Sequence, residues 1–340
     1  MSVLSLNAIG HLSAAHLIMQ KTTTSTHSMS VDGVFQENGS TLTESDRQRA
    51  NANGLDIRLL VLDLDGTIVG DSNHINEPVK QAIKAAQAKG IRVAIATGRM
   101  YCSALRFHRE IGSTLPLLAY QGALIQDPIA QKRYRHWPVA QSLAIELLDY
   151  FEQSEFSQEI AVHVYVDDRL YVKEIATATQ AYAQRSQVDP IAIGNLRQAL
   201  TSDPTKILAM SRDGSAAMAD RSALADRLYE KLKRRYAPSD LYLTKSSGQF
   251  LEAANPASDK GTAVQYLAEE VLALQPHNVM AIGDNFNDLE MIEYAGIGVA
   301  MENAPEAVKS RANYVAPNVE RNGAATAIQN ILLATRPTLG

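Results

Sequence analysis

The chain has 340 residues, a formal net charge of −5 and one cysteine, Cys102. This length accommodates a sizeable core and two domains, and the modest negative charge gives no sign of a nucleic-acid or membrane surface. A single cysteine cannot form an internal disulfide, which favours a reducing, cytoplasmic compartment, and no apolar run approaches the ~18 residues that a membrane span needs.

Residues 1–54 differ from the rest of the chain because they are rich in Ser, Thr, Asn and Gly. This composition predicts a mobile N-terminal extension. It lacks the charged start and apolar centre of a secretory signal. Targeting to an organelle is an alternative, since no acidic residue precedes Val31, but the absence of Arg there argues against it.

The stretch LLVLDLDGT begins the folded part of the chain at residues 59–67. Its four apolar residues predict a strand buried on both faces, as in parallel sheets. Asp63, Asp65 and Gly66 then end the strand, because acids and glycine do not continue a buried strand. Two carboxylates this close repel unless a cation lies between them, and Mg²⁺ prefers such oxygen ligands.

A βαβ unit follows. Its helix is predicted over 77–89, where Pro78 suits the first turn and Gly90 the end, and its second strand covers 91–96. Such a unit is parallel and right-handed, so Thr97 is expected at the same sheet edge as Asp63. The next elements are a helix over 100–112, a strand over 115–120 and a hairpin within 123–137.

The pattern changes over residues 139–247. A helix leads into two alternating strands, 159–167 and 169–172, which Asp167-Asp168 joins as a hairpin turn. Further segments are a strand over 205–211, a charged helix near 215–235 and a strand over 240–245. The alternation predicts a sheet with one exposed face and therefore an α+β module distinct from the parallel core.

The βα alternation resumes in the last part of the chain. A strand over 279–283 ends in a second acidic turn, GDNFND. The other expected elements are 249–254, 297–301 and 313–316 as strands and 260–273, 304–311 and 324–333 as helices. The predicted domains are a core formed by 55–138 and 248–336, with 139–247 inserted between its two parts.

Four polar motifs stand in order along the chain. They are DLDGT at 63–67, TGR at 97–99, DKG at 259–261 and GDNFND at 283–288. Taken singly, each motif also has an alternative explanation as a turn or an exposed lysine. Three of them, however, follow predicted strands and Lys260 opens a helix, so all four can meet at one sheet edge. A cation is unfavourable at a helix N-terminus, which indicates an anion near Lys260. Together the motifs predict a site for a phosphate and Mg²⁺.

With these motifs the chain, over about 56–335, resembles the haloacid dehalogenase superfamily of phosphatases, in particular the Cof-type branch, subfamily IIB with a C2B cap. The resemblance implies an α/β fold: a Rossmann-like parallel-sheet core with an inserted α+β cap domain. It implies that Asp63 is the nucleophile and Asp65 the general acid/base. The implied phosphate- or substrate-binding residues are Thr97, Gly98, Lys260 and Asn287. The implied metal-site residues are Asp63, Asp65, Asp284 and Asp288.

One motif departs from that family's pattern. The family often has Asn-Gly-Ala after the third strand, and here the residues are Gln121-Gly122-Ala123. For Arg99, which completes TGR, a structural ion pair and a substrate contact are equally compatible with the sequence. His163, Tyr165 and Tyr171 lie on predicted strands of the inserted module, where aromatic residues more often pack than line a substrate site.

We therefore expect a Mg²⁺-dependent phosphatase, a phosphoric monoester hydrolase that forms an aspartyl-phosphate. Its substrates would be small phosphorylated metabolites such as sugar phosphates, flavin nucleotides or pyridoxal phosphate. A phosphosugar mutase similar to phosphomannomutase shares the cap type and is one alternative. A non-catalytic phospho-aspartate binding or signalling protein is another, which Asp65 and Lys260 disfavour. No nucleic-acid or membrane partner is expected, and the protein is expected to be a monomer or homodimer.

Overall fold

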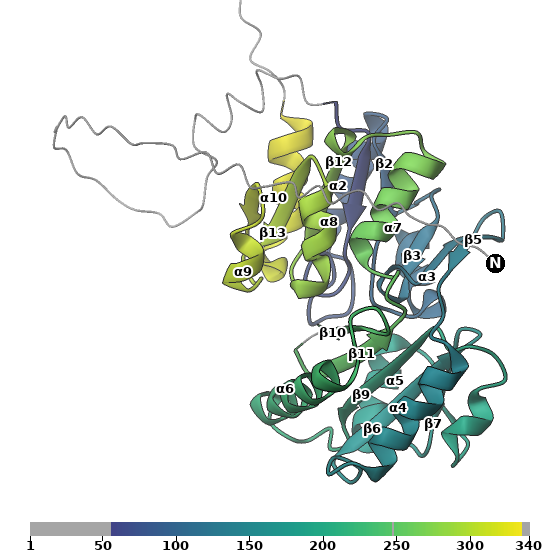
Figure 1. The fold of residues 1–340 in the computed structure, drawn as a ribbon. Coiled ribbons are helices and arrows are strands. Elements are labelled where there is room, and N and C mark those ends of the chain that lie inside the picture. Colours follow the sequence, from purple (N-terminus) through teal and green to yellow (C-terminus); the bar gives the residue numbers. More distant parts are fainter. Residues whose placement is uncertain (1–55, 247, 335–340) are drawn as a thin grey trace, which may run out of the picture. The chain divides into compact units, whose positions relative to one another are not determined.

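The structure is a computed structural model that describes residues 56–246 and 248–334 (Figure 1). The expected mobile extension, 1–54, lies outside the described residues. The described chain contains a five-stranded, a six-stranded and a three-stranded sheet. The strands are β1 (Leu59–Leu62), β2 (Arg92–Ile95), β3 (Leu117–Ala119), β4 (Leu124–Asp127), β5 (Lys132–His136), β6 (Ile160–Val166), β7 (Arg169–Val172), β8 (Ile191–Ala192), β9 (Lys206–Ser211), β10 (Tyr242–Ser246), β11 (Phe250–Ala254), β12 (Val279–Gly283), β13 (Ile297–Met301) and β14 (Tyr314–Ala316).

The five-stranded sheet has the order β14-β13-β12-β1-β2, and all its strand pairs are parallel. Leu59 of β1 is paired with Val279 of β12 on one side and with Arg92 of β2 on the other. The three strands therefore run in register toward one edge of the sheet. All four residues of β1 are buried, as an unbroken apolar run predicts for a strand covered on both faces. The predicted α/β fold class is confirmed.

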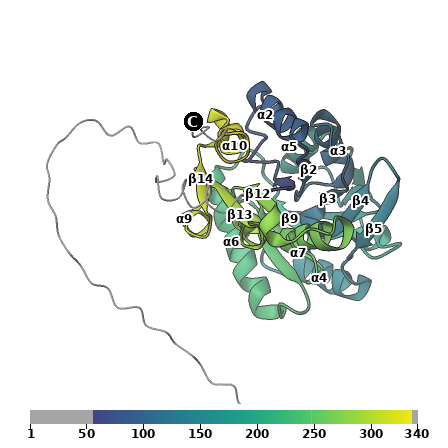
Figure 2. The ribbon, with the colours of Figure 1, turned by 90° about the horizontal axis from the view of Figure 1, so that it is seen from above.

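Helices cover both faces of this sheet. The α-helices of the described chain are α2 (Glu77–Ala88), α3 (Tyr101–Glu110), α4 (Gln141–Gln153), α5 (Thr177–Ser186), α6 (Met218–Arg235), α7 (Lys260–Tyr266), α8 (Leu289–Tyr294), α9 (Glu306–Lys309) and α10 (Gly323–Ile328). Leu60 and Leu62 pack with apolar residues of α2 and α10, whereas Leu59 and Val61 pack with α7 and α8. Figure 2 shows α2 and α10 on one side of the sheet and α7 on the other. None of the helices in 56–246 and 248–334 combines the length and the apolar character that a membrane crossing requires.

The three-stranded sheet adjoins β2. It has the order β3-β4-β5 with antiparallel pairs, and a parallel bridge between Ala96 and Leu118 connects it to the end of β2. The hairpin predicted within 123–137 is confirmed as β4 and β5. After β3 the chain turns sharply at Tyr120 and Gln121, which have φ values of 53° and 59°. This turn points Gln121 toward the carboxyl edge of the parallel sheet, where its backbone N–H donates to the Thr97 carbonyl at 2.9 Å.

The six-stranded sheet has the order β10-β11-β9-β6-β7-β8. Its β6–β7 hairpin turns at Asp167 and Asp168, which have φ values of 50° and 57°, so the predicted turn is confirmed. Strand β11 pairs with β10 and β9. The sheet therefore continues to Ala254, beyond the boundary at residue 247 that the sequence had suggested. The antiparallel pairing of β11 with both β10 and β9 decides this.

Both faces of the sheet are covered at β9, whose six residues are all buried, so the expected exposed face is wrong there. Apolar residues of α4 and α6 pack on one face, against Ile207 and Ala209 of β9. The alternate residues Leu208 and Met210 belong to a cluster that is continuous with the core of the parallel sheet. The alternation seen in the sequence thus separates two environments, because α5 covers part of the second face and the rest borders the cleft.

Candidate active site

The carboxyl ends of β1, β2 and β12 bring three sequence motifs together. Asp63 directly follows β1 and Asp284 directly follows β12, and these strands pair in parallel. Thr97 follows the end of β2, which pairs with β1 on the other side. The Asp63 backbone N–H donates to the Ile282 carbonyl at 3.0 Å, which fixes the start of the loop beside β12. The expected meeting of Asp63 and Thr97 at one edge is confirmed.

Lys260 lies between two of the carboxylates at this edge. Its Nζ is 2.6 Å from Asp63 Oδ1 and 2.5 Å from Asp288 Oδ1, and its side chain is 1% exposed. Lys260 is the first residue of α7, after the N-cap Asp259. Burial alone would lower the pKa of Lys260, but Asp288 and Asp63 hold it above its ordinary value. The anions that the sequence required near this lysine therefore include two of the protein's own carboxylates.

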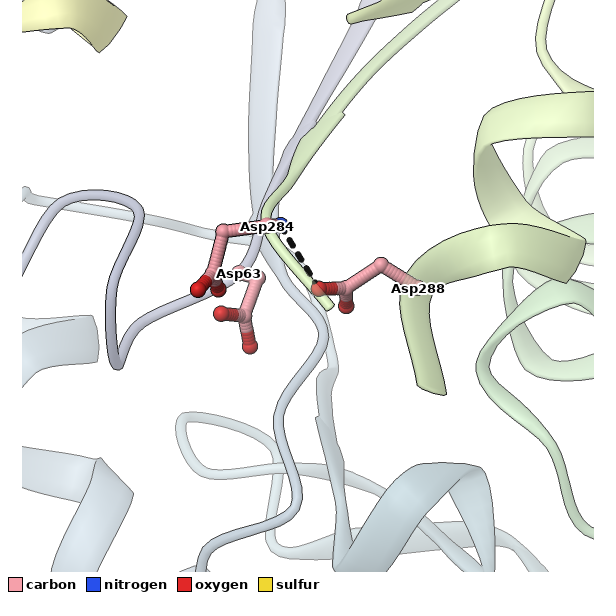
Figure 3. A group of neighbouring side chains, drawn as sticks. All are labelled: Asp63, Asp284 and Asp288. Atoms are coloured by element: carbon pink, nitrogen blue, oxygen red, sulfur yellow. Dashed lines mark hydrogen bonds between the residues drawn. The ribbon is translucent and has the colours of Figure 1, made fainter. Parts of the chain in front are cut away.

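Asp284 faces Asp63 from the neighbouring strand (Figure 3). Its Oδ1 accepts from the Thr67 hydroxyl at 3.3 Å and its Oδ2 from Asn303 Nδ2 at 3.1 Å. A Cβ on Gly66 would lie only 2.2 Å from Asp284 Oδ2, and Gly66 has a φ of +87°. Only glycine meets both conditions, so the DLDGT loop can press against this carboxylate.

Asp288 has both carboxylate oxygens engaged. Oδ1 contacts Lys260, and Oδ2 accepts from the backbone N–H groups of Asp284 at 2.8 Å and Asn285 at 3.0 Å. Figure 3 shows the first of these backbone bonds. Asp288 can therefore hold the loop and Lys260 in place, whereas each oxygen of Asp284 accepts a single hydrogen bond and can accept a further ligand.

The buried charges do not balance. Oxygens of Asp63, Asp284 and Asp288 lie within 4.8 Å of one another, and three ionised carboxylates against one ammonium would leave an excess of two negative charges. Burial, only partly offset by Lys260, raises the pKa of Asp63 to about 7. Burial together with the Asp63 and Asp288 charges raises the pKa of Asp284 well above its ordinary value. Hard oxygen donors with an excess of negative charge fit a divalent cation.

Asp65 lies apart from this acidic group, and its carboxylate faces two arginines. Arg99 donates to it from Nε and Nη2, both at 2.6 Å, and Arg185 donates from Nη2 at 3.0 Å. Burial acts to raise the pKa of Asp65, but Arg99 and Arg185 outweigh burial and hold it below its ordinary value. Of the two roles that the sequence left open for Arg99, the structure shows an ion pair. Arg185 comes from α5 of the inserted module, and no sequence signal marked it.

A buried polar network connects the inserted module with the motif loops. Lys206 Nζ contacts Glu252 Oε2 at 3.0 Å and the Gly98 carbonyl at 2.9 Å. Gln121 donates to Glu252 at 3.3 Å and accepts from Asn287 Nδ2 at 3.0 Å. Gln121 is the residue that departs from the family pattern, and Lys206 and Glu252 were not predicted as site residues. Their signal in the sequence was a charged residue within each of two otherwise apolar strands.

A cleft of about 560 Å³ adjoins these groups. Residues of the parallel-sheet part and of the inserted module both line it, among them Asp63, Thr97, Lys206 and Asn287. His163 and Tyr165 are fully buried, and His163 Nε2 lies 3.0 Å from Thr179 Oγ1. They pack beneath the cleft rather than line it, as the packing interpretation of the sequence predicted.

The sequence profile of haloacid dehalogenase-like hydrolases matches residues 60–328, most of the chain. The chain belongs to this family. The resemblance to the haloacid dehalogenase superfamily that was inferred from the motifs is confirmed.

Curated relatives and solved structures of this hydrolase family match over most of their length. A 5-amino-6-(5-phospho-D-ribitylamino)uracil phosphatase of Bacillus subtilis, YitU, is 28% identical over 269 residues, covering 78% of this chain and 94% of its own. The crystal structure of TM0651 from Thermotoga maritima has a TM-score of 0.66 at 28% identity and covers 84% of this chain and 100% of that one. The HAD subclass IIB sugar phosphatase BT4131 shares the fold, with a TM-score of 0.66, 19% identity and coverage of 82% and 100%.

Proposed function

We propose that this hydrolase is a Mg²⁺-dependent phosphatase of small phosphorylated metabolites and that Asp63 is its nucleophile. The observation that carries the proposal is the position of Asp63 at the end of the central strand, beside Lys260 and at the wall of the cleft. Of the two Asp63 oxygens, Lys260 contacts Oδ1, so Oδ2 can face a phosphorus atom. An attacking carboxylate oxygen next to a buried ammonium suits transfer of an anionic phosphoryl group.

The metal would be held by Asp63 and Asp284, with the backbone carbonyl of Asp65. When bound, Mg²⁺ neutralises the carboxylates and the phosphate oxygens and so reduces the repulsion between an anionic nucleophile and an anionic ester. The excess of two buried negative charges supports a divalent ion at this place. Asp288, whose oxygens are engaged by Lys260 and backbone N–H groups, would stabilise the site without binding the metal directly.

The reaction would proceed in two steps. In the first, a carboxylate oxygen of Asp63 bonds to phosphorus, the ester P–O bond breaks, and the leaving oxygen takes a proton from Asp65. In the second, Asp65 takes a proton from water, the water oxygen bonds to phosphorus, and inorganic phosphate leaves Asp63. The Thr97 hydroxyl, the loop N–H groups and Lys260 would hold the phosphoryl oxygens. Gly98 and Asn287 would shape the same subsite.

Proton donation requires a change around Asp65. Arg99 and Arg185 both stabilise its ionised form. Arg99 comes from the parallel-sheet domain and Arg185 from the inserted module, so movement of that module can release one arginine while the other remains. We infer that the module, from residue 139 to the end of β11, acts as the cap of the active site. The core would then comprise 55–138 and the chain after Ala254.

The substrate class follows from the cleft and from the relatives. A cleft of about 560 Å³ accommodates a small phosphorylated metabolite. Several relatives are named as phosphatases of 5-amino-6-(5-phospho-D-ribitylamino)uracil, a small molecule that carries a pyrimidine ring on a phosphorylated polyol. Esters of this kind, together with sugar phosphates, flavin nucleotides and pyridoxal phosphate, form the proposed substrate range.

The experiment is release of inorganic phosphate from a panel of such esters, with Mg²⁺ and with EDTA. We expect metal-dependent release from at least one ester, and its loss by at least about 10⁴-fold in Asp63→Asn, which keeps the shape but not the nucleophile. Asp189→Asn, at an exposed position outside the cleft, is the matched control. Near-normal turnover in Asp63→Asn would refute the assignment of the nucleophile. Conversion of a hexose 1-phosphate to its isomer without net phosphate release would refute the hydrolase reaction.

A further inference from the structure

The cap side of the cleft has a different chemistry from the phosphate side. Tyr182 of α5, Met210 of β9 and Phe250 of β11 line it. The Tyr182 and Phe250 rings meet edge to face, with centroids 5.8 Å apart and an interplanar angle of 83°. We call these three residues the aromatic wall. Its position follows from the alternation of the cap strands, because Met210 and Phe250 point away from the α4 and α6 layer.

Two polar side chains near this wall have buried atoms without a partner. Among the described residues, neither Arg221 Nε nor Gln249 Oε1 has a hydrogen-bond partner, although both atoms are inaccessible to solvent. Arg221 and Gln249 both line the cleft. A Cβ on Gly248 would lie 3.5 Å from Ser222 Oγ, so the turn that carries Gln249 abuts the start of α6, where Arg221 lies. Gln249 directly precedes Phe250, and both polar residues line the same cleft as the aromatic wall.

Such unpaired buried groups are uncommon in folded proteins, and a ligand is one way to satisfy them. No ion pair within the described residues engages Arg221, whereas the other basic residues of the cleft, such as Arg185 and Lys206, contact a carboxylate. Arg221 presents a guanidinium donor and Gln249 an amide acceptor, next to an apolar aromatic surface. Aromatic side chains pack best against a flat apolar surface, and a planar ring presents such a surface over its whole face.

We propose that the aromatic wall, Arg221 and Gln249 bind a planar heteroaromatic ring with an amide-like N–H and C=O edge, carried by the leaving group of the phosphate ester. This inference rests on the proposed function, since it names the class of ester that the site hydrolyses. The ring would pack against Tyr182, Met210 and Phe250, where aromatic and thioether groups contact a flat apolar surface favourably. Its carbonyl oxygen would accept from Arg221, and its N–H would donate to Gln249.

The test compares esters that differ only in the ring. The first pair is uridine 5′-monophosphate and ribose 5-phosphate, and the second is flavin mononucleotide and ribitol 5-phosphate. We expect kcat/KM for the ring-bearing member to exceed that of its ring-free partner by at least about tenfold in one pair or both. Equal kcat/KM values in both pairs, or a clear preference for a bisphosphate such as fructose 1,6-bisphosphate, would overturn the inference while leaving the phosphatase assignment intact.

Variants test the named residues. Arg221→Met and Phe250→Leu keep most of the side-chain volume, and we expect each to reduce the ring preference about tenfold or more without a comparable change for the ring-free ester. Arg234→Met, on the same helix but outside the cleft, is the matched control. An equal loss for both members of a pair would show a structural role only, and would refute the assignment of that residue.

A binding measurement separates the two proposals if no ester is hydrolysed. Calorimetry with uridine and ribose, and with riboflavin and ribitol, reports ring binding without turnover. Measurable binding of a ring-bearing compound alone, with loss in Arg221→Met, would support the ring site even if the phosphatase proposal failed. Absence of binding by both ring-bearing compounds at millimolar concentration, together with absence of ring preference in hydrolysis, would refute the ring site.

Discussion

Replacing Lys260 by Met tests the charge balance of the active site. The substitution removes the ammonium that lies 2.6 Å from Asp63 and 2.5 Å from Asp288, in a place where Lys260 is 1% exposed. Removing one partner of a buried ion pair costs about 3–5 kcal/mol, because the remaining charges are left uncompensated. In metal-free protein at pH 8 we therefore expect the free energy of unfolding to fall by about that amount. Bound Mg²⁺ supplies positive charge at the same place, so the loss should be smaller when Mg²⁺ is present.

The loss of stability in Lys260→Met should also depend on pH. Asp63 has a pKa raised to about 7, so at pH 6 most of the metal-free folded protein carries it protonated. Less negative charge is then left unpaired when Lys260 is absent. The loss of stability in Lys260→Met should therefore be smaller at pH 6 than at pH 8. Phosphatase activity should fall about 10²–10³-fold, as when one preorganised group that stabilises the transition state is removed.

The assay is urea unfolding of the wild type and Lys260→Met at pH 6 and pH 8, with EDTA and with Mg²⁺. Lys231→Met is the control, because its pair with Glu155 spans 3.3 Å at the surface, where the two side chains are 54% and 60% exposed. Such a surface pair contributes at most about 1 kcal/mol. A loss in Lys260→Met no larger than in the control, or an equal loss at both pH values, would refute the charge-balance argument.

Three further predictions concern the same site. The pKa of Asp63 in the folded protein, about 7, lies above its ordinary value of 3.8, so ionisation of Asp63 should lower the free energy of unfolding of the metal-free protein as pH rises from about 4 through 7. In Asp63→Asn, thermal unfolding should show a smaller decline over this pH range. An unchanged slope would contradict this prediction. In Gln121→Asn the shorter side chain cannot keep both of the native contacts, to Glu252 of the cap and to Asn287. We therefore expect kcat/KM to fall about tenfold with little change in melting temperature. A wild-type kcat/KM would show that the network is dispensable. Gly66→Ala places a Cβ against the Asp284 carboxylate at positive φ, and we expect it to lower the Mg²⁺ affinity measured by calorimetry. Gly194→Ala is the control, because Gly194 also has a positive φ but a Cβ there would have no neighbour within 4 Å. Equal effects of the two substitutions would point to backbone strain alone.

The sequence by itself was sufficient for the architecture of the parallel-sheet domain and for its four motifs. Parallel strands must finish at one edge of their sheet, so residues that directly follow buried strands, such as Asp63 and Asp284, have to meet there. The same rule placed Thr97 beside them. Hairpin turns were also local enough to predict, because Asp167 and Asp168 tolerate the left-handed backbone that such a turn needs.

Only the tertiary structure decided how the inserted module meets this edge. Arg185, Lys206 and Glu252 lie far from the motifs in sequence, and their contacts with Asp65, Gly98 and Gln121 depend on how two sheets are placed against each other. The strand pattern of the module showed two faces but not that the second face is turned inward, because periodicity reports alternation of environment and does not identify it. Contacts between side chains of different domains have no fixed spacing in the chain, so the residues of the aromatic wall could be named only from the folded structure.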